Sequence, residues 1–123
     1  MPKLPDGHRI MEARLAAIAQ RAQEANARLE DGLAALRRLV EIAKGNTGQP
    51  RRVADFLLAW WNPAACGTFA LTDLWAVDAD IVDDMVSVFQ LVADQQEYPT
   101  AWGLGPDFEE IVAKWRPELS QES

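Results

Sequence analysis

The sequence predicts an all-α protein, a single small helical domain of about five helices with a long N-terminal helical arm. No segment keeps the alternation of apolar and polar residues that marks a strand, whereas several repeat apolar residues with a helical period. The early part of the chain is almost entirely Ala, Leu, Arg, Glu and Gln, which are good helix formers. At 123 residues and 49% apolar, the chain has enough material for one hydrophobic core.

The first predicted element runs from about residue 9 to residue 43, behind a flexible leader at residues 1–8. Its apolar residues alternate three and four apart, as in a heptad seam, but the first half of the seam is mostly alanine. Gly32 follows two acidic residues and is predicted to interrupt the helix. We therefore expect an arm at residues 9–31, a candidate surface for homodimerisation, and a compact domain at residues 32–119 with a short tail at residues 120–123.

The segment 50–61 predicts the central helix of the domain, because it is apolar over most of its circumference. Its main apolar face holds Val53, Phe56, Leu57 and Trp60, widened by Leu58 and Trp61. A turn at residues 45–49 precedes this helix, and Pro50 suits its first turn. Asn62 before Pro63 predicts its end, since a residue that precedes proline disfavours the helical conformation.

The remaining elements are predicted from their boundaries. We expect a loop at residues 63–69, a brief helix to Ala76 and a long helix from Asp78 to Gln95, with Asp78 at its N-cap. The residues expected on the inner face of the long helix are Ile81, Met85, Val88, Phe89 and Val92. A loop at residues 97–105 then leads to a last helix that begins at Pro106 and ends before Pro117.

The net charge of −7 is unevenly distributed. Residues 1–52 carry ten of the twelve basic residues against six acids, and residues 53–123 carry thirteen acids against two basic residues. No apolar run reaches the length of about 20 residues that spans a bilayer, and the first residues lack the apolar stretch of a secretory signal. The single cysteine allows no intrachain disulfide. We therefore expect a cytoplasmic protein without a membrane partner.

Four stretches of the sequence carry a family resemblance. These are ALRRLVEIAKGNTGQPRRVADFLLAWWN, GTFALTDLWAVD, YP and FEEIVAKWRPEL, which span about Leu33 to Leu119. They resemble a family of short uncharacterised proteins, of unknown function, encoded on plasmids and integrative elements of proteobacteria. The resemblance implies a bacterial mobile-element context, and it implies no activity and no site residues. The arm lies outside it.

The inventory of reactive side chains argues against an enzyme. His8 and Cys66 are the only imidazole and the only thiol, and His8 falls in the predicted leader, where nothing would hold it against a nucleophile. One cysteine and one histidine cannot make a zinc site. The acidic run after Asp73 offers weak candidate ligands for a divalent cation, namely Asp78, Asp80, Asp83 and Asp84. Acids at helix starts are stabilising without a metal, so we expect no cofactor.

Two groups of residues are candidates for binding. The basic group consists of Arg37, Arg38, Lys44, Arg51 and Arg52. It predicts either a contact for phosphate or an acidic surface, or internal ion pairs with Glu41, Asp55 or the acidic C-terminal half. The aromatic group is Trp61, Trp102 and Tyr98, since exposed aromatic residues often anchor protein interfaces. We expect Trp60, Trp75 and Trp115 to pack inside.

From these observations we expect a small, acidic, non-enzymatic accessory protein that binds a macromolecular partner. We expect this partner to be a protein. Homodimerisation through the N-terminal helix is one form that such binding could take. One alternative is a nucleic-acid-linked module that uses the basic group, which the sequence pI of about 4.6 disfavours. Another is an acidic decoy or inhibitor of a host nucleic-acid-binding or defence protein.

Overall fold

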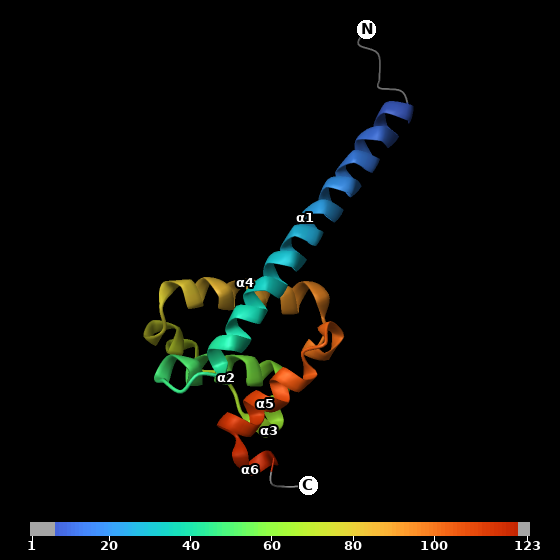
Figure 1. Cartoon of the computed structure of the whole chain (residues 1–123). Helices are drawn as coiled ribbons and strands as arrows, with labels where there is room; N and C mark the ends of the chain where they lie inside the picture. The colour runs from blue at the N-terminus through green and yellow to red at the C-terminus, as the bar shows by residue number, and fades with distance from the viewer. Residues whose placement is uncertain (1–6, 121–123) are drawn as a thin grey trace.

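The computed structural model describes residues 7–120, and its secondary structure is all helical, with no strand in this range (Figure 1). The all-α fold class is therefore confirmed. The elements in chain order are α1 (Gly7–Ala43), α2 (Gly48–Trp61), α3 (Pro63–Cys66), the 3-10 helix η1 (Leu71–Ala76), α4 (Ala79–Gln95), the 3-10 helix η2 (Pro99–Trp102), α5 (Gly105–Trp115) and α6 (Pro117–Ser120). Within the described residues, no helix combines the length and apolarity that crossing a bilayer requires.

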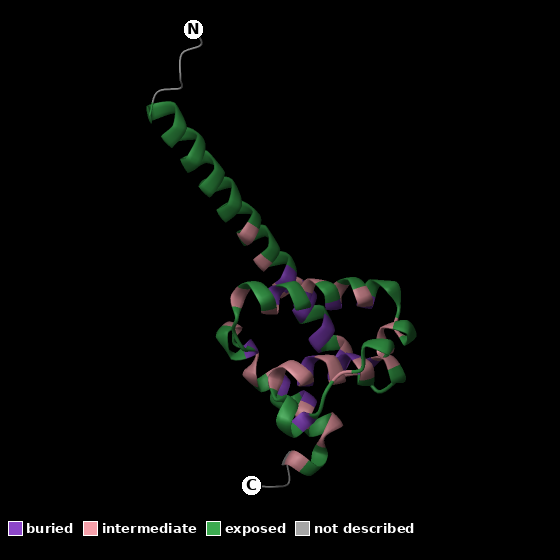
Figure 2. Ribbon diagram, turned by 180° about the vertical axis from the view of Figure 1, so that it is seen from behind, coloured by how far each residue is buried: buried purple, intermediate pink, exposed green. Residues whose placement is uncertain are grey.

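Helix α1 is continuous over 37 residues, which makes it about 55 Å long at the usual rise per residue. Its first part projects away from the domain and is exposed, and its last part enters the core (Figures 1 and 2). Residues 7 and 8, assigned by the sequence to the leader, belong to this helix, and residues 1–6 lie outside the described range. The predicted arm is therefore longer than expected and shares one helix with the domain.

The predicted break at Gly32 is wrong, since α1 continues through this residue. Gly32 instead allows a close approach between two helices. A Cβ atom at Gly32 would lie 3.0 Å from the Cβ of Leu91 in α4. The absence of a side chain therefore lets α1 cross α4 closely. What changes at Gly32 is burial. The described residues before it are exposed apart from the half-buried Ala25 and Leu29, whereas one face of the helix after it is buried in the core.

The core forms where the last part of α1 meets α2, α4 and α5. Its buried apolar residues are Ala35, Leu36, Leu39, Val40 and Ala43 from α1, Val53, Ala54, Leu57 and Leu58 from α2, Cys66 from α3, Ile81, Met85, Val88 and Leu91 from α4, and Phe108 and Ile111 from α5. Helices α2 and α4 run across the domain one above the other in Figure 1, and α1 contacts both of them. The predicted central helix is α2, which shares the centre of the domain with the end of α1.

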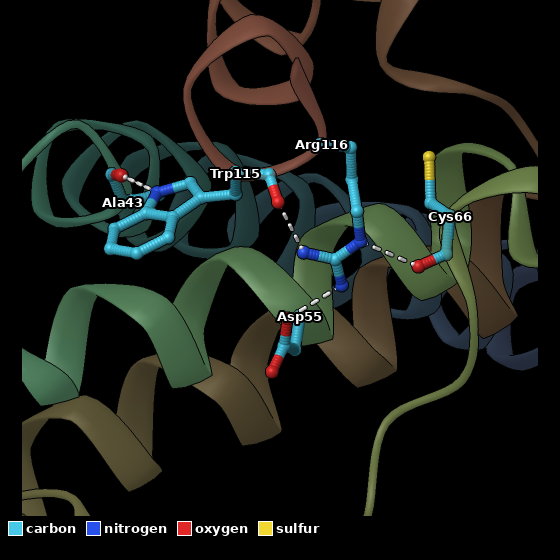
Figure 3. Close-up of polar contacts among 5 residues, drawn as sticks. All are labelled: Ala43, Asp55, Cys66, Trp115 and Arg116. Atoms are coloured by element: carbon cyan, nitrogen blue, oxygen red, sulfur yellow. Dashed lines mark hydrogen bonds and ion pairs between the residues drawn. The ribbon is translucent and has the colours of Figure 1, made fainter. Parts of the chain in front are cut away.

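Two adjacent residues at the end of α5 add polar contacts to the rest of the domain (Figure 3). The indole Nε1 of Trp115 donates to the carbonyl of Ala43 at 2.6 Å. The guanidinium of Arg116 donates to the carbonyl of Cys66 at 2.9 Å, to the carbonyl of Trp115 at 2.9 Å and to the carboxylate of Asp55 at 2.7 Å. One side chain thus joins the end of α5 to α2 and α3.

Replacing Gly32 with alanine sets two effects against each other. Alanine raises helix propensity by about 1 kcal/mol, but its methyl group would be forced against Leu91, and overpacking costs about 1–3 kcal/mol. We expect crowding to dominate and Gly32→Ala to lower the free energy of unfolding by about 1 kcal/mol in urea titrations. Gly7→Ala, where nothing lies within 4 Å of the added methyl group, is the control without crowding. A stabilised Gly32→Ala variant would contradict the close approach.

Arg116→Met keeps most of the side-chain volume and removes the hydrogen bonds to Asp55, Cys66 and Trp115. Because the Asp55 carboxylate would stay partly buried without its cation, we expect a loss of about 2 kcal/mol in the free energy of unfolding. Arg51→Met is the matched control, since Arg51 is exposed and forms no ion pair with any residue between 7 and 120; it should melt like the parent protein. Equal melting temperatures for both variants would refute this role of Arg116.

Candidate functional site

The basic group predicted from the sequence does not form one surface, because three of its members are paired with acids of different elements. Arg38 donates to both carboxylate oxygens of Asp84 on α4, at 2.8 and 3.0 Å. Lys44 donates to Asp107 at the start of α5 at 2.8 Å and also approaches Glu110 and Glu41. The hydrogen bonds to Asp84 and to Asp107 raise the pKa of Arg38 and of Lys44, respectively.

The other members of the group differ from one another. Arg52 lies 3.7 Å from Asp73 in η1, and its buried Nε has no hydrogen-bond partner among the described residues. Arg37 and Arg51 are exposed and form no ion pair within residues 7–120. Asp55, one of the acids considered as internal partners of this group, is bound by Arg116 instead. Only Arg37 and Arg51 therefore remain available to a phosphate or an acidic surface.

The candidate metal ligands are also dispersed. The carboxylate of Asp78 accepts from Nε2 of Gln49, whose Oε1 accepts from the backbone N–H of Asp78 at 2.8 Å. Asp78 thus occupies the predicted N-cap of α4, but its side chain does not cap the helix. Asp84 is held by Arg38, while Asp80 and Asp83 are exposed. Across residues 7–120, no three metal-ligating side chains gather at one point.

The predicted aromatic candidates fall in two environments. Trp61 stacks on Phe108 with ring centroids 5.2 Å apart, and Trp102 packs against Trp60 at 6.2 Å, so both are half-buried parts of the domain. Tyr98 is 60% exposed and lies at the edge of a groove. Trp60 lines the same groove and donates its Nε1 to the carbonyl of Glu97.

This groove is a concave surface with a volume of about 800 Å³. It lies between α2 and α4, with η1 and residues 96–98 at its ends. The lining is Phe56, Ala59 and Trp60 of α2, Pro63, Phe69, Leu71 and Leu74, Met85, Val86, Val88, Phe89 and Val92 of α4, and Gln96, Glu97 and Tyr98. Glu97 is the only charged member, so the groove is apolar and its one charge is negative. We call it the α2–α4 groove.

The α2–α4 groove has a buried floor and an exposed rim. Met85 and Val88 form part of the floor and belong to the core. Phe56 and Phe69 meet edge to face, with ring centroids 5.3 Å apart. At the rim, Leu71 is 75% exposed, Phe89 is 71% exposed and Val86 is 60% exposed. Large apolar side chains exposed together around a hollow indicate a binding surface.

Two predictions of inward packing are wrong, and both concern this side of the molecule. Phe89 has the spacing of a core residue but points to the rim of the groove, and Trp75 of η1 is 86% exposed. A signal for the groove was present in the sequence of α4. Its core stripe is Ile81, Met85, Val88 and Leu91, and Val86, Phe89 and Val92 extend the apolar arc beyond what one neighbouring helix covers.

The lining of the groove is suited to binding and offers little for catalysis. It contains no serine, cysteine, histidine, lysine or arginine, so it has neither a nucleophile with a base nor a cation to stabilise a developing negative charge. The free thiol of Cys66 is buried elsewhere, and this burial raises its pKa. The groove therefore presents an apolar trough for a complementary apolar ligand.

Comparison with known proteins agrees with the boundary seen in α1. The family profile DUF7673, described as a family of unknown function, matches residues 33–116. No curated protein and no solved structure matches the chain. The matched region begins directly after Gly32 and ends at Arg116, so it covers the packed domain and leaves out the projecting part of α1. The uncharacterised family expected from the sequence motifs is thereby confirmed: the chain belongs to DUF7673, a family of unknown function.

Proposed function

We propose that this protein is a non-enzymatic accessory protein that binds a partner protein by holding one amphipathic, basic helix in the α2–α4 groove. The single observation that carries this proposal is the apolar groove with Val86, Phe89 and Leu71 exposed at its rim. Docking of an apolar helix face into a groove between helices is a common mode of peptide recognition. Helix α4 is about 25 Å long, enough to lie along four to five turns of a bound helix.

The charge around the groove supports a basic partner. Between Phe56 and Tyr98 the sequence holds seven acidic residues and no lysine, arginine or histidine. Of these acids, Asp80 and Asp83 are exposed on α4, and Glu97 lies in the groove itself. A helix with apolar residues on one face and arginine or lysine beside them would match both the lining and the surrounding field.

The other expected functions find less support. A nucleic-acid-linked module would need the basic group, but Arg38, Lys44 and Arg52 are each engaged with acids of the domain. An acidic decoy for a nucleic-acid-binding or defence protein is a special case of the proposed binding, because the basic helix of such a protein would fit the groove. We further propose, from the sequence resemblance, that the protein is bacterial and encoded on a plasmid or integrative element. Its cytoplasmic location is likewise a proposal, which rests on the features of the sequence described above.

The proposal is tested with a model ligand. A fluorescent synthetic helix with leucine on one face and lysine beside it should bind the dilute full-length protein, as measured by anisotropy, whereas the same helix with glutamate for lysine should bind at least tenfold more weakly. The double variant Val86→Ser with Phe89→Ser should weaken binding of the lysine helix at least tenfold. Its melting temperature should stay nearly unchanged, because both side chains are exposed.

The matched control is Ala101→Ser with Ala113→Ser, two exposed positions outside the lining of the groove, which should bind like the parent protein. If the lysine helix binds the rim variant as tightly as the parent, the groove is not the site. If neither helix binds the parent protein, the proposed function fails.

A further inference from the structure

The occupant of the α2–α4 groove can be identified from the chain itself. Resting on the proposed function of the groove, we propose that it receives the arm of a second copy of this protein, where the arm is residues 7–28 of α1. The basic, amphipathic arm of one copy then covers the acidic, apolar groove of the other copy.

The arm has the features expected of the bound helix. Met11, Leu15 and Ile18 recur at helical spacing and are 62%, 59% and 59% exposed, respectively. No described residue of the same chain covers them, since α1 is helical without interruption and leads away from the domain (Figure 2). The basic residues of the arm include Arg14, Arg21 and Arg28, which follow one another seven residues apart and so flank the apolar seam along one edge.

The arm cannot reach the groove of its own chain while α1 stays intact. Burial after Gly32 fixes the direction in which the helix leaves the domain, and the helix then continues to Gly7 without a turn. Folding back would require breaking the helix. The contact is therefore intermolecular.

Pairing of one arm with another is the obvious competitor, and the charge pattern disfavours it. With Leu15, Ala22 and Leu29 at position a of a heptad, the three arginines all fall at position g. In an antiparallel pair g faces g, so arginine would meet arginine. In a parallel pair they would face the e positions of the following heptads, which are Ala19, Asn26 and Leu33, and find no acid there. The seam between two arms would also be thin, because Ala22 and Ala25 occupy its middle.

The groove supplies what a second arm lacks. Its lining offers large apolar side chains for Met11, Leu15 and Ile18. Exposed Asp83 precedes Val86 by one helical turn, and Glu97 lies at the end of the groove. Arg14 and Arg21 form no ion pair with any described residue of their own chain, so both are available to these acids. Arg28 is already bound to Asp94 of α4 at 3.1 Å, which illustrates the pairing of an arm cation with this acidic helix.

The test is a complementation experiment with full-length chains. Sedimentation velocity over a range of concentrations should show self-association of the parent protein, weakened by salt because opposite charges meet. An arm variant, Leu15→Gln with Ile18→Gln, and the rim variant, Val86→Ser with Phe89→Ser, should each raise the apparent dissociation constant at least tenfold. All four positions are exposed, and circular dichroism checks that helix content and melting are kept.

The mixture of the two variants decides between two kinds of association. In arm exchange, the arm of one copy binds the groove of another; in arm pairing, the arms of two copies bind each other. The rim variant keeps an intact arm and the arm variant keeps an intact groove, so mixing them should recover association between the two species. The labelled peptide 7–28 should likewise bind the arm variant and not the rim variant. If the rim variant self-associates like the parent, the arms pair with each other and the proposal is wrong.

The remaining outcomes separate this inference from the function on which it rests. A parent protein that stays monomeric at high concentration, but binds the lysine helix in a manner that depends on Phe89, would overturn arm exchange and leave the groove as a site for another protein. Failure of both the lysine helix and the arm peptide to bind would overturn both proposals.

Discussion

The close approach of α1 and α4 at Gly32 and Leu91 is the constraint on which the rest of the structure depends. It places the last part of α1 against α4 on one side, while the turn at residues 44–47 returns the chain as α2 on another. With α1 inserted in this way, α2 and α4 have one side of each committed to the core, and their remaining apolar side chains line the groove. The same crossing determines the direction of the exposed arm.

Electrostatic contacts follow this arrangement. The buried part of α1 brings Arg38 and Lys44 to the acidic elements that surround it, where they bind Asp84 and Asp107. Arg116 reaches back from the end of α5 to Asp55 of α2. The Arg38–Asp84 and Lys44–Asp107 pairs are partly exposed, and such pairs contribute modestly to stability. The acids that have no ion-pair partner within residues 7–120, such as Asp80 and Asp83, produce the negative surface beside the groove.

Most of the fold could be predicted from the sequence, because helical periodicity and proline positions are local signals. The long α2 and α4 and the helix after Pro106 were expected, whereas short α3 was assigned to a loop. Gly32 was misread because propensity treats a glycine as a weak point, and only the tertiary contact with Leu91 reveals its use. Phe89 and Trp75 were misplaced because apolar character predicts burial without saying which side is covered. The groove is lined by separate segments between residues 56 and 98 that only the tertiary fold brings together, and the extra apolar residues of α4 were a local signal for it. Of the three aromatic candidates, Tyr98 lies at the rim, whereas Trp61 and Trp102 are half-buried outside the lining.

The uneven distribution of basic residues has a consequence for proteolysis. Trypsin cleaves after lysine and arginine, and none lies between Arg52 and Lys114. The projecting part of α1, in contrast, presents Arg14 and Arg21 on exposed turns of the helix, and exposed segments open locally with ease. A protease of this specificity would cut the arm first and leave the packed domain with its groove. On complete digestion most of that domain would survive as the one long peptide 53–114.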